Sequence, residues 1–444
     1  MANTYLTRTP SGAGNGNTWT FSAWVKKGNP SATQFLIGSS TSASDFEDIR
    51  FNATTGELSY VRYLTTKQWG FDSSTNLRDV NGWYHILVNR NGTTMNYYLN
   101  GVSQTKTNET TSTSTGDFNT TDELRIGGRP DTTSYTFDGI MSHVHWIDGT
   151  AYDASAFGST DSTTGEWKIN TSPSVTYGTN GFFILKDGNS GTDQSPNTNN
   201  FTASGDLTKT EDCPSNVFAT LNPLWRSRFE NDVVLSKGNL KASFSSSSNR
   251  GYAMSSIGVT SGKYYFEVKA VDKARLYIGV GDGNYIAGLT SAIWSANPSN
   301  GIALNVNSGN LEYNGTDNTS YGTGASDNDI IQVALDMDNY LLWFGVNGTW
   351  MNSATQTQIE NGTATYDVTT AIGTKNIINN GEPINIFALD GSTSGTSDAE
   401  FNFGNGYFGT TAVSSAGTNA SGIGIFEYDV PTGYTALSTK GLNE

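Results

Sequence analysis

Two acidic residues in the stretch DFEDIRF have a spacing that could serve acid–base chemistry. If this stretch is a strand, Asp45 and Glu47 lie on the same face, because the side chains of a strand alternate between its two faces. Two carboxylates about 5–5.5 Å apart can act as nucleophile and acid/base in retaining hydrolysis of a glycosidic bond. The same spacing often arises by chance, so the pair alone does not predict an enzyme.

Two histidines in the stretch SHVHW raise the question of a metal site. On a strand, His143 and His145 would share a face, as metal ligands do. No third ligand is near them in the sequence: His85 lies in a different predicted strand, and Cys213 is the single cysteine. One cysteine excludes an intrachain disulfide and a site of several thiolates. We therefore predict a structural histidine pair, no bound metal and no cofactor.

Motifs for other kinds of catalysis are missing from the sequence. It has no nucleophile elbow, no phosphate-binding P-loop and no Cys-x-x-Cys pair. The glycine-rich stretch GVGDGN is not followed by a helical pattern that could supply a positive dipole end to a phosphate, and it is typical of a β-turn. We therefore predict that the protein is not an enzyme.

The charge of the chain excludes two classes of partner. The sequence has 25 Lys and Arg against 41 Asp and Glu, a formal net charge of −16. Nucleic acids and anionic membrane surfaces are bound by clustered cations, so we predict no nucleic-acid partner. The first residues lack the pattern of a signal peptide, and no stretch has the apolar length of a membrane-spanning helix, so we expect synthesis in the cytoplasm and no membrane insertion.

Strand patterns dominate the chain. Aromatic and β-branched residues alternate with polar ones in stretches such as TWTFSAWVKKG and KYYFEVKAV, which Gly and Asn turns separate. Amphipathic helical patterns are nearly absent. This predicts an all-β protein with antiparallel β-sandwich domains.

One predicted hairpin, ALDMDNYLLWFGVNGTW, has no candidate nucleophile but several aromatic residues. Strand alternation places Trp343 and Phe344 on opposite faces, so that one is in the core. Asp336 and Asp338 flank a turn, where aspartate side chains accept hydrogen bonds from backbone N–H groups, and we favour this role over calcium binding.

A change of pattern divides the chain. Residues 201–239 contain prolines and little alternation, which predicts an irregular connector. We therefore predict a first domain at 1–200 and a second domain, with a C-terminal extension, at 240–444.

The two halves resemble known families. NGWYHILVNRNGTTMNYYLNG and DGIMSHVHWIDGTAYDASAFG resemble the laminin-G-like, concanavalin A-like jelly roll. GKYYFEVKAV, VALDMDNYLLWFGVNG and AEFNFGNGYF resemble a SPRY domain. Together with FATLNPL and YDVPTGYTALSTKGL, they resemble the laminin-G-plus-SPRY proteins of bacteriophages, which are classed with tail-fibre and other virion-surface proteins. The chain departs from long fibres because it has no heptad repeats for a shaft.

Saccharide binding needs flat aromatic faces together with planar polar groups, which loops on a rigid sandwich can supply. The stretches of the first domain that we expect to be loops offer Trp69, Phe71, Arg129, Tyr135 and Phe137. Those of the second domain offer Tyr285, Trp294, Tyr313, Tyr321 and Trp350. The resemblance to SPRY domains, which bind proteins through loops at one end of the sandwich, favours the second set as a partner-binding edge.

The resemblance implies a non-enzymatic virion-surface protein that attaches to a host glycan or protein and contacts other virion proteins, as a homo-oligomer. A purely architectural decoration or connector is one alternative. A glycan hydrolase on a jelly roll is another, although the Glu-x-Asp-x-x-Glu order of the glucanases is absent.

Overall fold

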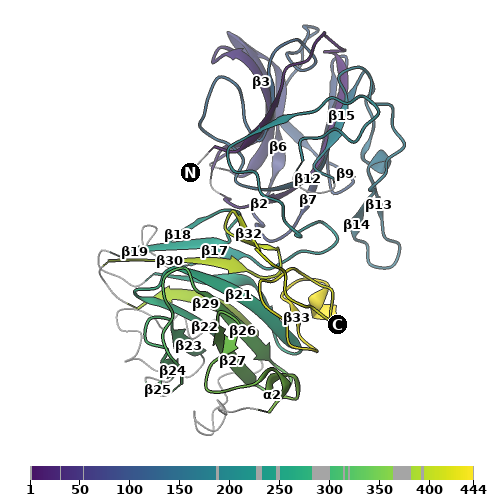
Figure 1. Cartoon of the computed structure of the whole chain (residues 1–444). Coiled ribbons are helices and arrows are strands. Elements are labelled where there is room, and N and C mark those ends of the chain that lie inside the picture. The colour runs from purple at the N-terminus through teal and green to yellow at the C-terminus, as the bar shows by residue number, and fades with distance from the viewer. Residues whose placement is uncertain are drawn as a thin grey trace. The chain divides into compact units, whose positions relative to one another are not determined.

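The computed structural model describes residues 3–30, 32–53, 55–186, 190–226, 233–246, 251–282, 301–313, 316–318, 321–363, 382–391 and 395–443. The chain forms two compact units (Figure 1). Unit 1 is Met1–Lys209 with Cys213–Ser215, and unit 2 is Thr210–Asp212 with Asn216–Glu444.

Unit 1 contains a sheet, called sheet A here, with the strand order β10-β6-β5-β4-β3-β11-β1-β16. Its strands are β1 (Tyr5–Arg8), β3 (Gln34–Ser42), β4 (Asp45–Phe51), β5 (Glu57–Leu64), β6 (Thr66–Asn76), β10 (Lys106–Thr110), β11 (Leu124–Ile126) and β16 (Thr202–Ser204). All its pairings are antiparallel.

The second sheet of unit 1, sheet B, has the order β15-β12-β2-β7-β8-β9. Its strands are β2 (Thr18–Lys27), β7 (Tyr84–Asn91), β8 (Thr94–Leu99), β9 (Val102–Ser103), β12 (Gly139–Asp148) and β15 (Phe182–Ile184). The turn η1 (Ala154–Ala156) precedes a hairpin of β13 (Gly158–Thr160) and β14 (Trp167–Ile169).

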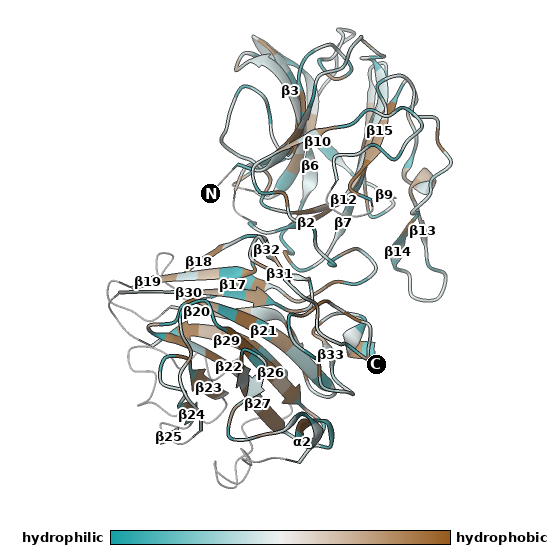
Figure 2. Ribbon diagram, viewed as in Figure 1, coloured by the Kyte–Doolittle hydropathy of each residue, from teal (hydrophilic) through white to brown (hydrophobic). Residues whose placement is uncertain are grey.

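The core of unit 1 lies between sheets A and B. Four alternate residues of β2 are fully buried in it, namely Trp19, Phe21, Ala23 and Val25. Trp19 stacks on Trp146 of β12, with ring centroids 4.9 Å apart. Alternation in the sequence therefore becomes a sandwich core, and Figure 2 shows hydrophobic residues mainly along the strands.

Unit 2 is a second sandwich. Sheet C has the order β17-β20-β29-β22-β23-β24-β25, and sheet D has the order β18-β19-β30-β21-β26-β27-β28. The strands of sheet C are β17 (Leu221–Arg226), β20 (Tyr252–Val259), β22 (Leu276–Gly281), β23 (Gly301–Asn305), β24 (Leu311–Tyr313), β25 (Thr316–Asn318) and β29 (Ile384–Asp390). Those of sheet D are β18 (Val233–Ser236), β19 (Lys241–Ser246), β21 (Lys263–Asp272), β26 (Ile330–Asp336), β27 (Leu341–Val346), β28 (Thr349–Trp350) and β30 (Gly395–Asn402).

The remaining elements of unit 2 are short. They are α2 (Gln356–Glu360), β31 (Tyr407–Phe408), β32 (Thr411–Ala412), β33 (Thr435–Ala436) and η2 (Gly441–Asn443). Strand β33 pairs with β21 in parallel. Within the described ranges, no helix has the length and apolar composition that crossing a membrane requires.

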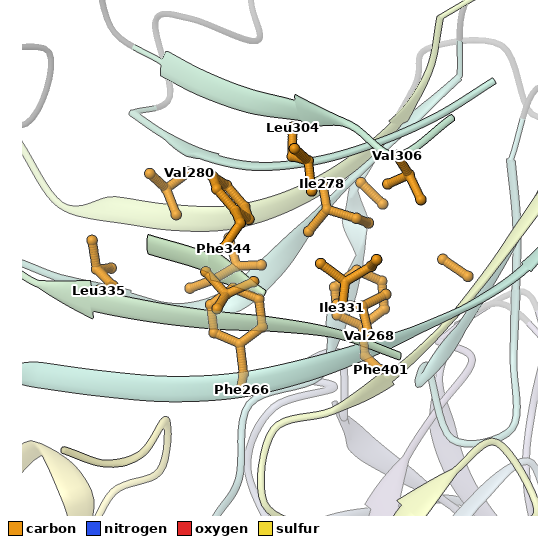
Figure 3. Packing of buried hydrophobic residues seen from close by; sticks show 14 of the residues in the cluster. Phe266, Val268, Ile278, Val280, Leu304, Val306, Ile331, Leu335, Phe344 and Phe401 are labelled. Atoms are coloured by element: carbon orange, nitrogen blue, oxygen red, sulfur yellow. The ribbon is translucent and has the colours of Figure 1, made fainter. Parts of the chain in front are cut away.

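The hairpin of β26 and β27 confirms the predicted alternation. Phe344 faces the core between sheets C and D, where it lies among Phe266, Ile331 and Leu335 (Figure 3). Trp343 faces the other side of sheet D, where Phe426 and Tyr434 of the C-terminal extension belong to the same buried cluster.

Asp336 ends β26 in the capping role that the sequence predicts. Its carboxylate accepts hydrogen bonds from the backbone N–H groups of Asp338 and Asn339, at 3.1 and 2.9 Å. Lys263 Nζ lies 3.0 Å from the same carboxylate. Asp336 therefore holds the turn through backbone donors and one cation.

A buried glutamate holds the C-terminal extension against sheet D. The Glu267 carboxylate accepts hydrogen bonds from the backbone N–H groups of Glu427 and Tyr428, both at 2.9 Å, and from Tyr265 Oη at 3.0 Å. Burial raises the pKa of Glu267 to about 7, although these donors favour the charged form. The extension is therefore an integral layer of unit 2.

The all-β class and the antiparallel sandwiches predicted from the sequence are confirmed. Residues 201–239 differ from the predicted irregular connector, because they include β16 in sheet A, β17 in sheet C and β18 in sheet D. These are edge strands in their sheets, and a short strand with one neighbour needs no regular alternation in sequence.

Candidate functional site

The acidic pair that could serve hydrolysis does not form an open site. Glu47 is fully buried and faces the core of unit 1. Its carboxylate accepts hydrogen bonds from Tyr60 Oη at 2.5 Å and from the Phe118 backbone N–H at 2.8 Å, and Trp69 Nε1 donates to Tyr60 Oη at 2.6 Å. Burial raises the pKa of Glu47. We conclude that Glu47 belongs to a core network that a substrate does not reach.

Asp45 lies at the edge of this network in an ion-pair cluster. Arg62 Nη1 is 2.6 Å from a carboxylate oxygen of Asp45 and 2.6 Å from one of Asp117. Burial raises the pKa of Asp117 to about 8, although the Arg62 charge opposes this shift. The cluster therefore joins Arg62 to two carboxyl groups.

Trp69 and Phe71 are core residues and not loop residues, contrary to our prediction. Both lie in β6 with 1% and 0% of their surfaces exposed. Gly70 between them has φ +139°, and a Cβ there would lie 2.1 Å from the Tyr60 carbonyl oxygen. The glycine therefore permits a close approach of β5 to β6.

Arg129 and Tyr135 are brought together by the segment between β11 and β12, residues 127–138. Arg129 donates to Asp131 at 2.6 Å through Nε and to Asp48 at 2.8 Å through Nη1. Its guanidinium lies 3.8 Å from the ring centroid of Phe46 and 4.9 Å from that of Phe35. Phe46 and Asp48 alternate with the core residues of β4, so the segment covers the outer face of sheet A.

Tyr135 presents an aromatic ring to solvent. It is 57% exposed, and its ring packs edge-on against Phe35 with centroids 6.1 Å apart. Its carbonyl oxygen accepts a hydrogen bond from the Phe35 backbone N–H at 2.9 Å. Its φ is +65°, a left-handed conformation that is uncommon for an aromatic residue and costs of the order of 1 kcal/mol or more. The fold therefore holds this exposed ring in place at an energetic cost.

A second accessible aromatic residue lies on the same face, and our sequence analysis missed it. Tyr63 of β5 is half-buried and stacks on Phe46, with centroids 5.2 Å apart and an interplanar angle of 9°. The alternation of β5 could have found it, because Leu58 and Tyr60 face the core and Tyr63 therefore faces outward. We define the Tyr135 surface as Phe35, Phe46, Tyr63, Arg129, Asp131 and Tyr135.

The charged groups of the Tyr135 surface stabilise one another. Burial raises the pKa of Asp48, which Arg50 and Arg129 oppose. Burial also acts to raise the pKa of Asp131, but its hydrogen bonds and charge contact with Arg129 hold it below its usual value. The surface combines two accessible aromatic rings with a neutralised polar network, an arrangement suited to sugar hydroxyls and C–H groups.

The packing of this surface predicts an effect of Gly38 in β3. A Cβ at residue 38 would lie 2.9 Å from Arg129 Cβ and from the Gly128 carbonyl oxygen. Gly38→Ala is therefore expected to displace the 127–138 segment and to lower the free energy of unfolding by about 1–3 kcal/mol, measured by chemical denaturation. Gly12→Ala is the control, since a Cβ there meets nothing within 4 Å. Equal stability of the two variants would contradict this packing.

The predicted residues of unit 2 offer no accessible site within the described ranges. Tyr321 is 3% exposed, and its Oη accepts a hydrogen bond from the Phe344 backbone N–H at 3.1 Å. Trp350 is 8% exposed and packs edge-on against Tyr265. The prediction of loop contacts is wrong for both, because segments distant in the sequence cover them. Three further predicted residues of unit 2 lie outside the described residues, namely Tyr285, Trp294 and the side chain of Tyr313. In unit 1, the predicted residue Phe137 is half-buried and packs against the core.

A buried Ser22–His85 pair has the distance of a nucleophile and its base but not the chemistry. Ser22 Oγ lies 2.9 Å from His85 Nε2, and Trp167 Nε1 donates to His85 Nδ1 at 3.0 Å. Because an indole N–H only donates, Nδ1 accepts and the proton of the neutral ring is on Nε2. Nε2 therefore donates to Ser22 and cannot take its proton, the reverse of a catalytic triad. Both residues are also buried.

The histidine rings of β12 lie beside the same phenylalanine, as a pair on one face would. A bulge lies between Ser142 and His145, with His143 at φ +49°, and the His143 ring packs against Phe183 with centroids 5.6 Å apart. His145 is buried, stacks on Phe183 at 3.9 Å and lies 3.0 Å from Tyr177 Oη through Nδ1. Among the described residues, no group of three or more His, Cys, Asp or Glu side chains is arranged to hold a metal.

Comparisons with known families agree with this geometry. Residues 2–156 match the family model of the concanavalin A-like lectin/glucanases superfamily, and residues 263–366 match that of the SPRY domain. The chain carries a concanavalin A-like domain followed by a SPRY domain. The Tyr135 surface lies within the first matched range and the β26–β27 hairpin within the second. No match was found among curated proteins.

Solved structures resemble parts of the chain at low identity. The SPRY domain of human HERC1 is 18% identical, with 41% of this chain and 96% of that chain covered and a TM-score of 0.30. The TRIM65 PSpry domain is 13% identical, with 41% and 91% covered and a TM-score of 0.27. A putative carbohydrate binding protein from Bacteroides ovatus is 13% identical, with 46% and 56% covered and a TM-score of 0.31.

Proposed function

We propose that the protein is a non-enzymatic attachment protein that binds saccharide through the Tyr135 surface of its concanavalin A-like domain. The observation that carries the proposal is the exposed Tyr135 ring, held at a positive φ beside the Arg129–Asp131 pair. The ring is exposed and its backbone conformation costs energy, so packing within the fold does not account for its position. Binding of a ligand to the ring would account for it.

The chemistry of the surface supports this ligand class. An aromatic face packs against the C–H groups of a pyranose, and carboxylate and guanidinium groups pair with its hydroxyls. Tyr135 supplies the face and Asp131 the acceptors, while Arg50, whose side chain is 23% exposed, adds donors beside Asp48. Rigid strands beneath hold these groups, so binding requires little ordering.

We further propose that the protein is displayed on a bacteriophage particle and attaches it to the host surface. This part rests on the resemblance of the sequence motifs to laminin-G-plus-SPRY phage proteins. The net charge of −16 is compatible with display in bulk solvent. An architectural role remains the outcome to expect if particle imaging buries the Tyr135 surface against other virion proteins.

A binding experiment with the purified full chain tests the proposal. We expect binding to a saccharide on a glycan array or to host cells, and we expect Tyr135→Ala to weaken it about tenfold or more through loss of the stacking face. Tyr135→Phe keeps the ring and should retain most of the affinity. Val102→Ala, which truncates a similarly exposed side chain in β9, is the matched control.

Two results would overturn the proposal. One is that the wild-type chain binds neither saccharide nor host surface. The other is that Tyr135→Ala binds as well as the wild type while Val102→Ala behaves normally.

A further inference from the structure

We infer that the saccharide bound at the Tyr135 surface is uncharged, an inference that rests on the function proposed above and names its ligand class. Acidic sugars carry carboxylate or sulfate groups, which proteins bind through guanidinium groups that have a free edge. Arg129, the one arginine of the Tyr135 surface, already uses such an edge for a carboxylate of the chain itself, and the two arginines beside it are ion-paired.

Arg129 shows this most clearly. Its Nε and Nη2 donate to the two carboxylate oxygens of Asp131 at 2.6 and 3.0 Å, and its Nη1 donates to Asp48 at 2.8 Å. The bidentate edge that would recognise a sugar carboxylate is therefore occupied by Asp131. Moving the Arg129 guanidinium to free this edge would also break its hydrogen bond to Asp48, which is a fully buried carboxylate.

The neighbouring arginines are ion-paired as well, each to its carboxylate through a single nitrogen. Arg50 Nη1 lies 3.0 Å from Asp48, and Arg125 Nε lies 2.6 Å from Glu123. The Arg125 guanidinium also lies 4.2 Å from the ring centroid of Tyr5. These three arginines and the carboxylates Asp48, Glu123 and Asp131 balance one another, which leaves no net positive charge to attract an anion.

The net negative charge of the whole chain also disfavours anionic ligands. A net charge of −16 repels polyanions, and the repulsion reaches roughly 8 Å at physiological salt. Neutral hydroxyls face no such barrier. An ion-paired carboxylate keeps lone pairs that can accept from a sugar hydroxyl without breaking its contact with arginine.

The test compares two saccharide classes on the full-length chain. The neutral probes are dextran, mannan and galactan, and the acidic probes are alginate, polygalacturonate and heparin. We expect binding to at least one neutral probe and to none of the acidic probes. We also expect the affinity to change less than about twofold between about 0.05 and about 0.5 M NaCl, because no ion pair forms on binding.

Asp131→Asn supplies a second readout. It removes the charge that occupies the Arg129 edge, so the folded variant should gain at least about tenfold in binding to the acidic probes. No gain would show that the occupied edge is not what excludes them, and would overturn the argument. Binding of the wild type to an acidic probe, lost in Tyr135→Ala, would overturn this inference while sparing the proposed saccharide function. Absence of binding to every probe and to host cells would overturn the proposed function itself.

Discussion

Replacing Glu47 with alanine is expected to lower the free energy of unfolding of unit 1 by about 3–5 kcal/mol. The change leaves Tyr60 Oη and the Phe118 N–H without their acceptor inside the buried core, and it opens a cavity among large aromatic side chains. Each orphaned donor costs about 1–3 kcal/mol, and the cavity adds to this cost. Denaturant unfolding of the full chain, followed by tryptophan fluorescence, measures the loss in the transition of unit 1.

Two further variants separate stability from chemistry at this residue. Glu47→Gln keeps the volume and one acceptor oxygen, so its loss should be smaller than that of the alanine variant. Glu123→Ala, which removes a carboxylate from a surface ion pair, should cost at most about 1 kcal/mol. A loss under 1 kcal/mol in Glu47→Ala, or saccharide cleavage that Glu47→Gln abolishes, would contradict the place we give Glu47 in the core.

The second large expected effect is a loss of folding stability at low pH that is caused by His85. Burial lowers the pKa of His85 to about 3, against about 6.5 in an unfolded chain. Between about pH 3 and about pH 6.5, His85 therefore binds a proton in the unfolded state but not in the folded state. The stability contributed by neutral His85 is fully present above pH of about 6.5 and is lost as the pH falls toward 3. Between about pH 7.5 and about pH 5 the loss is about 2 kcal/mol.

The pH effect is best measured as a difference between proteins. The raised pKa of Asp117, about 8, acts in the opposite direction, because the folded state then gains a proton as the pH falls. His85→Gln leaves Asp117 unchanged, so its loss of stability between the two pH values should be about 2 kcal/mol smaller than that of the wild type. Burial lowers the pKa of His145 as well, so His145→Gln should also lose less stability than the wild type as the pH falls.

The protonation state of His85 can also be observed directly. Long-range proton–nitrogen NMR should show a neutral ring with its proton on Nε2 at about pH 5, since Trp167 donates to Nδ1. Titration of His85 near pH 6.5, or the opposite tautomer, would contradict the hydrogen bonds we describe.

Alternation in the sequence was sufficient for the strands and for the orientation of single residues within them. It placed Trp343 and Phe344 on opposite faces of β27, and both are found there. Trp69 and Phe71, which we expected in a loop, alternate as strand residues do and flank Gly70 in β6. Gly70 is needed for a contact with β5, which the local sequence does not contain.

The binding surface could be predicted only in part. Arg129 and Tyr135 were chosen from one stretch, and the structure brings them together on Phe35. Asp48 lies 81 positions from Arg129 in the sequence, so their ion pair follows from the pairing of β3, β4 and β11 and not from local pattern. Tyr321 was misjudged for the same reason, since the Phe344 N–H that binds it lies 23 residues away.

Our central claim is that the Tyr135 surface binds a saccharide. The most direct test is a crystal structure of the full chain with a neutral saccharide selected by the binding experiments. Our account predicts a pyranose ring against the exposed face of Tyr135, with hydroxyls hydrogen-bonded to the Asp131, Arg129 or Arg50 side chains. A saccharide bound only elsewhere, with the Tyr135 ring still open to solvent, would contradict it.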